Sequence, residues 1–371
     1  MMISSLRTVL FRNLADTELD TGGRDVFLVG ENGQGKTNFL EALYFCCYAS
    51  SFRGIRDGEL PRTGEKDCSV SIKITGSVYE RVLVKMEKGR KTISLDGKKI
   101  DDRKELLSVA PCIVFCHEDM EFVSGSPDRQ RWFFDQSQSL YDPVYLEDLQ
   151  RYRRVLKTRN SILKAGPETV DFAMLDALDP QMVSYGLALM EKREEAARQF
   201  SRTFAPLYEK VSGISDMGVR YIPSWKGEKA EEIGAYLHRK REGDLSLGVS
   251  LSGPHRDRYV FTQGKTEFTA KASTGQRRLL ALLLRIAQAR RFSENTGKNP
   301  ILLLDDVLLE LDPEKRRRLL TVLPGYDQAF YTFLPEEPYG RYRKPDTLIY
   351  RVEGGNLIPE TSAMFSPEEK T

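Results

Sequence analysis

An eight-residue stretch, residues 30–37, carries the side chains best suited to phosphate chemistry in this sequence. It fits the pattern G-x-x-x-x-G-K-[ST] at every fixed position, with Lys36 and Thr37 at its end. In such a loop the backbone N–H groups converge on phosphate oxygens, the lysine reaches the β- and γ-phosphates, and the hydroxyl binds Mg²⁺. We therefore expect ATP to bind here, through Gly30, Glu31, Asn32, Gly33, Gln34, Gly35, Lys36 and Thr37.

A second motif could complete this site. Four apolar residues, 301–304, precede Asp305 and Asp306. A phosphate-loop ATPase needs a strand that ends in a carboxylate near Mg²⁺, so we assign Asp305 to the metal together with Thr37. Asp306 is then the candidate for polarising the attacking water, which makes it catalytic. A buried strand that ends in a polar turn is the alternative, but the phosphate loop elsewhere in the chain favours catalysis.

The segments around these motifs predict an α/β domain. Residues 25–29 form a short apolar run, which indicates a buried parallel strand before the loop. Helical spacing of apolar residues follows Thr37, so the loop has the strand before it and the helix after it that the pattern requires. A chance glycine-rich turn would need neither.

A third motif, Ser273-Thr274-Gly275-Gln276, opens an apolar helix predicted from Leu279 to Ala289. A hydroxyl, a small glycine and free N–H groups at a helix start make an anion site, and the motif is similar to the signature of ABC-type ATPases. We therefore add Ser273, Gly275 and Gln276 to the ATP-binding residues, and Ser273 to the catalytic residues. The alternative is an ordinary helix N-cap by Ser273 or Thr274.

Composition and cysteine usage restrict the class of protein. The 371 residues include 40% hydrophobic and 30% charged residues, which is typical of a globular protein, and the net charge of +2 indicates no particular partner. Five cysteines lack paired C-x-x-C spacings and the three histidines are scattered, so we expect reduced thiols and no zinc site. No signal-peptide core or membrane-spanning run is visible, so we expect a cytoplasmic protein.

The hydrophobic pattern changes along the chain. Residues 68–75, 78–87 and 91–95 alternate apolar and polar side chains between glycines, which predicts an antiparallel β meander. Helical periodicity then dominates residues 127–165 and 180–212. Strand-like segments return at residues 257–261 and 267–270, so a helical insertion interrupts the α/β domain. We place the domains at 1–120, 121–245 and 246–371, with the insertion in the middle.

Along nearly its whole length the sequence resembles the RecF family of DNA repair proteins, relatives of the SMC ATPases. Besides the phosphate loop, the resemblance rests on eight motifs: Phe11-Arg12-Asn13, Leu40-Glu41-Ala42, Ser51-Phe52-Arg53, Glu118-Asp119, Gly125-Ser126-Pro127-x-Arg129-Gln130-Arg131, Lys157-x-Arg159-Asn160, Gly253-Pro254-His255-Arg256-Asp257 and Leu303-Leu304-Asp305-Asp306-Val307. Leu311-Asp312 also matches the dimer-facing D-loop of related ATPases.

The resemblance implies a fold and a function. The fold would be an ABC/SMC-type P-loop ATPase head with an antiparallel β meander and an inserted helical lobe. Such proteins dimerise with ATP between two heads, hydrolyse it slowly, and bind single-stranded and gapped duplex DNA without sequence preference. With RecR and RecO they assist the loading of RecA, in DNA replication, DNA repair and the SOS response to DNA damage.

The resemblance also decides how basic residues are interpreted. Arg151, Arg153, Arg154, Lys157 and Arg159 lie on one predicted helix. A solvated face would be preferred for an arbitrary basic helix, but family membership favours phosphate contacts with DNA. We select Arg151, Arg154 and Lys157, and add Arg53 from the loop after the first helix.

Several positions depart from the family pattern, so the resemblance predicts neither the turnover rate nor the affinity for DNA. They are His117 where Pro is usual, Arg258 where an acidic residue is usual, Leu309 where Ser is usual, and residues 49–51 where a basic residue is common. In addition, the switch histidine of transporters is absent near Thr332. That missing histidine argues against a transporter ATPase subunit. A small-metabolite kinase would need no signature motif, whereas a DNA scaffold that binds ATP without turnover stays an alternative.

Overall fold

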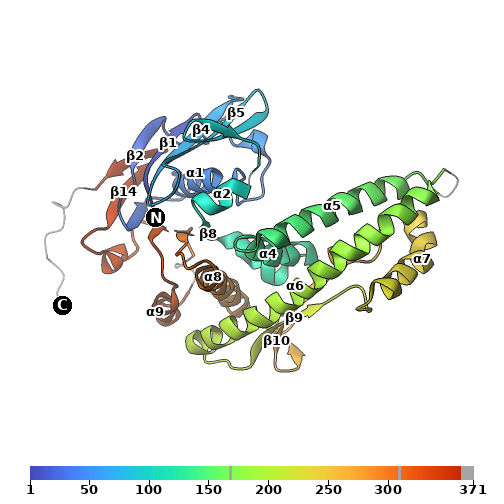
Figure 1. Cartoon of the computed structure of the whole chain (residues 1–371). Helices are drawn as coiled ribbons and strands as arrows, with labels where there is room; N and C mark the ends of the chain where they lie inside the picture. Colours follow the sequence, from blue (N-terminus) through green and yellow to red (C-terminus); the bar gives the residue numbers. More distant parts are fainter. Residues whose placement is uncertain (103, 167–168, 308–310, 361–371) are drawn as a thin grey trace. The chain divides into compact units, whose positions relative to one another are not determined.

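The computed structural model describes residues 1–102, 104–166, 169–307 and 311–360 (Figure 1). Internal contacts divide the chain into two compact units. The first, called the sheet unit here, contains Met1–Glu118, Gly297–Arg316 and the described residues from Leu323 onward. The second, the helical unit, contains Asp119–Thr296 and Arg317–Val322.

One six-stranded sheet of the sheet unit has the strand order β15-β14-β3-β13-β12-β8. Its strands are β3 (Asp25–Val29), β8 (Cys112–Phe115), β12 (Ile301–Leu304), β13 (Gln328–Phe333), β14 (Leu348–Glu353) and β15 (Asn356–Pro359). All neighbours pair in parallel except β15, which is antiparallel to β14. Every residue of β3, β8, β12 and β13 is buried, which explains why these strands consist mainly of apolar residues.

The second six-stranded sheet is the predicted meander, extended by strands from the N-terminus. Its order is β2-β1-β4-β5-β6-β7, with all pairs antiparallel. The strands are β1 (Met2–Val9), β2 (Thr17–Asp20), β4 (Cys68–Thr75), β5 (Arg81–Glu87), β6 (Arg90–Leu95) and β7 (Lys98–Ile100). In β5, buried residues alternate with exposed or half-buried ones, because one face of an antiparallel sheet covers a core.

Helix α1 (Lys36–Tyr48) joins the two sheets into one core. Ten of its thirteen residues are buried, and the apolar ones share one hydrophobic cluster with both sheets, represented by Leu43, Ile72 and Leu303. The Gln328 side chain links β13 to the N-terminus, since its amide donates to the carbonyls of Ile3, Thr21 and Gly23 and its oxygen accepts from Ile3 N. A short helix, α2 (Lys104–Val109), leads into β8.

Helices form most of the helical unit. They are α3 (Met120–Ser124), α4 (Pro127–Ser139), α5 (Pro143–Leu163), α6 (Phe172–Ser212), α7 (Ala230–Leu247) and α8 (Thr274–Thr296). The 41-residue α6 is about 60 Å long at 1.5 Å per residue and packs beside α5, α7 and α8. It begins eight residues before the predicted helical segment, because Asp171 caps it by accepting from Met174 N.

A three-stranded antiparallel sheet, β9 (Met217–Ile222), β10 (Arg258–Gln263) and β11 (Thr266–Glu267), also belongs to the helical unit. The prediction of a strand over residues 267–270 was wrong beyond Glu267, because the chain turns there and Phe268 O accepts from Lys271 N and Ala272 N. Pairing of β10 with β9 and packing of α8 on α6 explain why the unit extends to Thr296, past the predicted boundary at 245. Helix α9 (Pro313–Val322) follows the acidic motif of Asp305 and Asp306 in the sequence.

Candidate nucleotide-binding site

The phosphate loop has the backbone geometry that its glycines allow. Gly33 and Gly35 have φ angles of 79° and 117°, in the region that L side chains rarely adopt. Gly30 has another reason: a Cβ there would lie 2.4 Å from Val352 O of β14. The loop therefore follows β3 and turns directly into α1, as predicted, so that its N–H groups lie at the helix N-terminus.

The Lys36 side chain is folded back into this loop. Its ammonium donates to the carbonyl oxygens of Gly30 at 2.6 Å and Glu31 at 3.3 Å, and the residue is only 3% exposed. No carboxylate pairs with the ammonium within the described part of the chain, so its charge is available to an anionic ligand. This is the lysine position expected for contact with phosphates.

Thr37 and Asp305 meet at the edge of the parallel sheet. The Thr37 hydroxyl donates to Asp305 Oδ1 at 3.0 Å, because α1 starts beside the carboxyl end of β12. Burial raises the pKa of Asp305 to about 7, and the nearby Asp306 carboxylate adds to the effect. A buried carboxylate and a hydroxyl are oxygen ligands of the kind Mg²⁺ prefers, and the cation would compensate the buried negative charge. The two residues assigned to the metal therefore fit that role.

Asp306 has an uncommon backbone conformation, with a φ angle of +50°. Its N–H donates to Thr332 Oγ1 at 2.7 Å, and the Thr332 hydroxyl lies 2.7 Å from Asp306 Oδ1. Thr332 is at the end of β13, the strand next to β12. In the sequence, Thr332 was notable only because it stands where transporter ATPases have a histidine. No sequence pattern predicted that its hydroxyl would contact both acids of the motif.

Two further residues near the loop were not predicted. Asn13 Nδ2 lies 3.4 Å from Gly33 O, and Asn13 Oδ1 accepts from Asn38 at 2.7 Å. Glu337 is a buried carboxylate that accepts from Leu334 N at 2.7 Å. Burial raises the pKa of Glu337, and the charge of Lys36 opposes this effect, so the glutamate belongs to the electrostatic environment of the site.

Gln34 has a structural partner that limits its role. Its side-chain oxygen accepts from Gly354 N at 2.6 Å, and its carbonyl accepts from Gly355 N at 2.8 Å. The turn between β14 and β15 therefore holds the loop at Gln34. The main-chain N–H of Gln34 donates to Glu31 O at 3.4 Å within the loop.

The signature residues belong to the helical unit. Ser273 N donates to Gln276 Oε1 at 2.8 Å and Gln276 N donates to Ser273 Oγ at 3.3 Å, which is a reciprocal capping box at the start of α8. The N-cap interpretation of Ser273 is thus confirmed. Ser273 and Gly275 are also exposed, and a Cβ at Gly275 would meet nothing within 4 Å. The geometry leaves this helix start open to an anion, which keeps the signature interpretation as a prediction.

Comparisons with known proteins agree with this geometry. The model of the RecF/RecN/SMC N terminal domain matches residues 2–334. The DNA replication and repair protein RecF of Treponema pallidum (strain Nichols) is 44% identical over 352 residues, which cover 94% of this chain and 99% of the relative. The protein of the same name from Bacillus subtilis (strain 168) is 32% identical over 379 residues, with 96% and 100% covered.

The chain belongs to the RecF family. A solved structure of the recombination mediator protein RecF-ATP in the RecFOR pathway has a TM-score of 0.88 at 25% identity, and covers 97% of this chain and 98% of that one. An Smc head bound to the C-winged helix domain of ScpA has a TM-score of 0.55 at 16% identity, which supports the fold alone. The predicted ABC/SMC-type ATPase head is confirmed.

Several RecF motifs have structural partners. Arg12 Nε donates to Glu41 at 2.9 Å, and the Ser51 hydroxyl donates to the same buried carboxylate. Asp119 accepts from Arg285 at 2.7 Å, and both are buried. Arg12 and Ser51 therefore hold Glu41 of α1 within the sheet unit, and Arg285 holds Asp119 within the helical unit.

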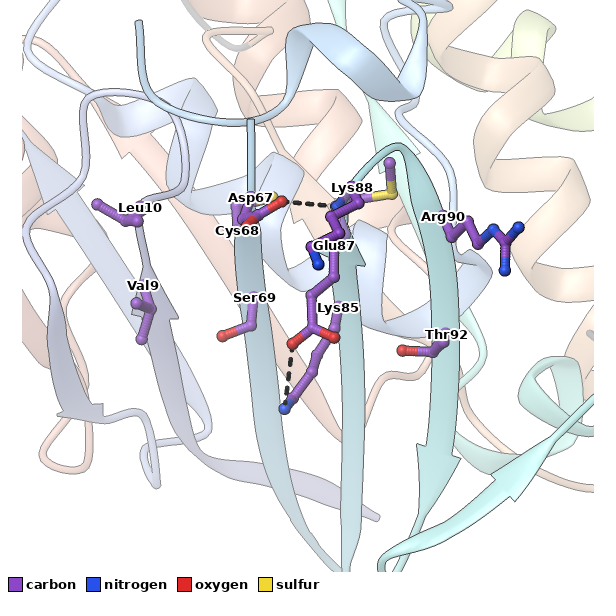
Figure 2. A pocket seen from close by; sticks show the side chains of 11 residues that line it. Val9, Leu10, Asp67, Cys68, Ser69, Lys85, Glu87, Lys88, Arg90 and Thr92 are labelled. Carbon is purple, nitrogen blue, oxygen red and sulfur yellow. Dashed lines mark hydrogen bonds and ion pairs between the residues drawn. The ribbon is translucent and has the colours of Figure 1, made fainter. Parts of the chain in front are cut away.

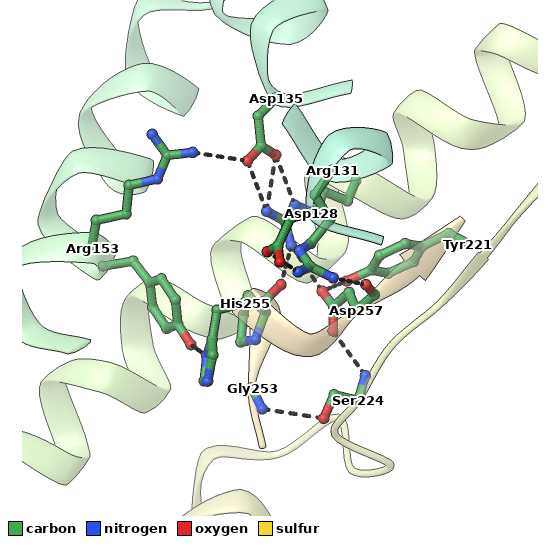
Figure 3. A network of polar contacts seen from close by, with 12 residues as sticks. Asp128, Arg131, Asp135, Arg153, Tyr221, Ser224, Gly253, His255 and Asp257 are labelled. Atoms are coloured by element: carbon green, nitrogen blue, oxygen red, sulfur yellow. Dashed lines mark hydrogen bonds and ion pairs between the residues drawn. The ribbon is translucent and has the colours of Figure 1, made fainter. Parts of the chain in front are cut away.

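The Gly253–Asp257 motif of RecF proteins is part of a buried polar network (Figure 3). Arg193 Nη2 donates to both carboxylate oxygens of Asp135 at 2.9 and 3.0 Å, and Arg193 Nη1 donates to Asp257 at 2.9 Å. Asp257 also accepts from Tyr221, and Arg131 donates to the Asp257 carbonyl. This network joins α4, α6, β9 and the residue before β10, so these polar side chains position helices.

The basic residues of α5 do not share one environment. Arg159 is fully buried and pairs with Asp179 at 2.8 Å and Asp244 at 2.7 Å, so it does not belong to a DNA-binding surface. Arg151 is exposed but pairs with Glu147. Arg154 and Lys157 are exposed, and neither has an ion-pair partner among the described residues. These two carry the available charge of the predicted DNA surface.

The remaining predicted positions are distributed over both units. Arg53 is exposed in the sheet unit and lies 3.3 Å from Asn38 Oδ1. Arg258 is exposed at the start of β10, and His117 begins a short 3-10 turn, His117–Asp119. Leu309 lies outside the described residues. Among the described residues, no helix is long and apolar enough to cross a membrane.

A cavity of about 690 Å³ in the sheet unit is separate from the phosphate loop (Figure 2). It opens on the outer face of β1 and β4–β6, and its charged side chains include Lys85, Glu87 and Arg90. Lys85 pairs with Glu87 at 3.6 Å, so part of the charge that lines the cavity is compensated. The cavity is lined by no residue of the three motifs, and we assign it no role in nucleotide binding.

Proposed function

We propose that this chain is an ATP-dependent DNA-binding protein of recombination and repair that acts near single-strand gaps. The observation that carries the nucleotide part is the contact between Thr37 of the phosphate loop and Asp305 of the acidic strand. This contact is expected where a Mg²⁺–ATP complex is held between the two motifs. Family membership and the RecF-ATP structure support ATP as the nucleotide.

Mg²⁺, when bound to Thr37 and Asp305, would neutralise charge on the phosphates. The residues of the chain then divide the work. The loop N–H groups and Lys36 orient the triphosphate, and Asp306 accepts a hydrogen bond from the attacking water and polarises it. This chemistry relies mainly on positioning. Hydrolysis is therefore slow as long as one head lacks a residue that has to contact the triphosphate.

The missing part of the site comes, in this proposal, from a second copy of the chain. Ser273 and Gly275 lie at an exposed helix start in the helical unit, whereas Lys36 and Asp305 belong to the sheet unit. A two-fold symmetric dimer would place the signature of each copy against the triphosphate of the other. ATP that binds the dimer more tightly than the monomer would stabilise the dimer by mass action, and the loss of the γ-phosphate would weaken it.

DNA is the proposed macromolecular ligand, as single strands and gapped duplexes without sequence preference. Arg154 and Lys157 on α5, with weaker support for the paired Arg151 and for Arg53, would contact backbone phosphates. RecR, RecO and RecA are the proposed protein partners, because the family acts in the RecFOR pathway. All five cysteines are buried and none forms a disulfide among the described residues, which supports the expected cytoplasmic setting.

Single-turnover ATP hydrolysis with gapped duplex DNA tests this proposal. The parent protein is compared with Lys36→Ala, which removes the ammonium from the loop, and with Lys98→Ala, which removes an exposed lysine of β7. The proposal expects slow hydrolysis by the parent and by Lys98→Ala, and none above background by Lys36→Ala. ATP binding without hydrolysis in the parent would instead favour a DNA scaffold.

A further inference from the structure

Thr332 contacts both acids of the second motif through a single hydroxyl. The residue is 5% exposed at the end of β13. Its Oγ1 lies 2.7 Å from Asp306 Oδ1 and 3.2 Å from Asp305 Oδ1, and it accepts from Asp306 N at 2.7 Å. A hydroxyl has one hydrogen, so it donates strongly to only one carboxylate at a time. The distances select Asp306.

These contacts close a ring around Asp306. One bond holds the main-chain N–H and the other holds the side-chain oxygen, so Thr332 restricts both φ and the carboxylate rotamer of the same residue. The φ angle of +50° is sparsely populated by residues other than glycine. Such a conformation persists only when its surroundings determine it, and here the two bonds from Thr332 do so.

The arrangement also separates two like charges. Asp305 and Asp306 are adjacent in the sequence, and a carboxylate beside another carboxylate tends to rotate away or take up a proton. Asp305 is already engaged by the Thr37 hydroxyl at 3.0 Å. The Thr332 hydroxyl supplies the corresponding bond to Asp306, which leaves the second oxygen of Asp306 for another partner.

We propose that Thr332 is a positioning residue for ATP hydrolysis, which fixes Asp306 in the one conformation that presents its second oxygen to the attacking water. This inference rests on the proposed ATPase function. Thr332 is expected to influence the rate of ATP cleavage and not the affinity for ATP, since its contacts are to the two acids and not to the phosphate loop.

Thr332→Val tests the proposal, because valine keeps the β-branched shape and removes the hydroxyl. Thr332→Ser, which keeps the hydroxyl, is the matched control. We expect the valine variant to bind ATP within about 3-fold of the parent but to hydrolyse it at least about 10-fold more slowly in a single turnover. The serine variant should retain a rate within about 3-fold of the parent, by the same reasoning. Thermal unfolding checks that all variants are folded.

A double-variant comparison distinguishes positioning from general structural damage. If Thr332 acts through Asp306, adding Thr332→Val to Asp306→Asn should change the remaining rate by less than about 2-fold. The Mg²⁺ concentration for half-maximal rate should also stay within about 2-fold of the parent value, since the strong bond is to Asp306 and not to the metal ligand Asp305.

Three results would overturn the assignment. They are a parent-like rate in Thr332→Val, an equal fold-loss in the presence and absence of Asp306→Asn, or a large shift in the Mg²⁺ requirement. Failure of the parent itself to hydrolyse ATP above the Lys36→Ala background would contradict the proposed ATPase function, and the role of Thr332 with it. A Thr332→Val protein that no longer binds ATP would show that the residue builds the site and does not position the base.

Discussion

The hydroxyl oxygen of Thr37 lies 3.0 Å from a carboxylate oxygen of Asp305, although 268 residues separate them in the sequence. The parallel pairing of β12 with β13, and of β13 with β3, brings the two motifs to the same edge of one sheet. Because β3 leads into the phosphate loop and β12 leads into the acids, sheet register alone brings the candidate metal ligands together. The helical insertion interrupts the sequence without disturbing this register.

Asp306→Asn should leave ATP binding intact and slow its cleavage. The amide keeps the size of the side chain and its contact with Thr332, but it is a poor proton acceptor. General base catalysis contributes about 10²- to 10⁴-fold, so a loss within that range is expected in single-turnover hydrolysis. Asp101→Asn, which removes the charge of an exposed carboxylate just after β7 and outside the three motifs, is the control. Parent-like hydrolysis by the Asp306 variant would remove the residue from its assigned role.

The combined replacement of Arg154 and Lys157 by alanine should weaken DNA binding across unrelated sequences. Each lost phosphate contact lowers the slope of log affinity against log salt by about 0.9 on duplex DNA, so two contacts lower it by about 1.8. Salt titrations of binding to two unrelated duplexes measure this slope.

Arg239→Ala with Lys240→Ala is the control for that experiment, because these exposed residues of α7 carry the same total charge. Their removal should leave the slope near the parent value. An unchanged slope in the α5 variant would move the DNA surface to another part of the chain, and the exposed Arg53 and Arg56 of the sheet unit would be tested next.

His255 should make the helical unit sensitive to acid. Its Nε2 lies 2.9 Å from Ser250 O and therefore donates, so its Nδ1 accepts from the Tyr152 hydroxyl at 2.8 Å and the ring is neutral. Burial lowers the pKa of His255 to about 4 from 6.5, and the charges of Arg256, Arg131 and Arg159 act in the same direction.

The sign of the effect follows from these two values. Between pH 6.5 and pH 4 the unfolded chain binds a proton that the folded state does not, so stability is full above pH 6.5 and decreases as the pH falls. At about 1.4 kcal/mol per pH unit the loss reaches at most about 3.5 kcal/mol. Unfolding by urea at pH 7 and pH 4.5 should show a smaller pH dependence in His255→Gln than in the parent. His238→Gln, on the exposed face of α7, should retain the parental dependence.

Ser273→Arg should block ATP-dependent dimerisation while sparing ATP binding by each monomer. The long charged side chain would occupy the space into which the partner's triphosphate must fit. Loss of the Ser273 cap costs about 1 kcal/mol by itself, so Asp171→Ala, which removes the cap of α6, is the matched control. Sizing with ATP and a separate nucleotide titration measure the two properties. Undiminished dimers of Ser273→Arg would contradict the signature assignment.

Much of the fold was predictable because its patterns are local. Apolar runs such as residues 301–304 identify strands buried on both faces, and alternation in residues 68–95 identifies the meander. The phosphate loop was predictable because its glycines, lysine and hydroxyl are contiguous. The end of the helical unit was not, since the pairing of β9 with β10 joins segments that no local pattern connects.

Side-chain pairing was the main property that the sequence could not predict. Arg159 and Lys157 lie on the same basic helix, yet Asp179 and Asp244 bury the first and leave the second exposed. Likewise, the hydroxyl of Thr332 contacts two acids that lie 26 and 27 residues earlier in the chain. Such contacts depend on tertiary packing, which residue type and spacing do not specify.

The measurement that tests the account most directly is the mass of the protein in solution with ATP, with ADP and without nucleotide. The 42.3 kDa chain should have about twice that mass with ATP and Mg²⁺, and should return to the monomer mass with ADP. Gapped duplex DNA should stabilise the ATP form, because a dimer offers two α5 surfaces. A monomer mass under all three conditions, at concentrations that saturate ATP binding, would contradict the proposal that ATP is enclosed between two copies of the chain.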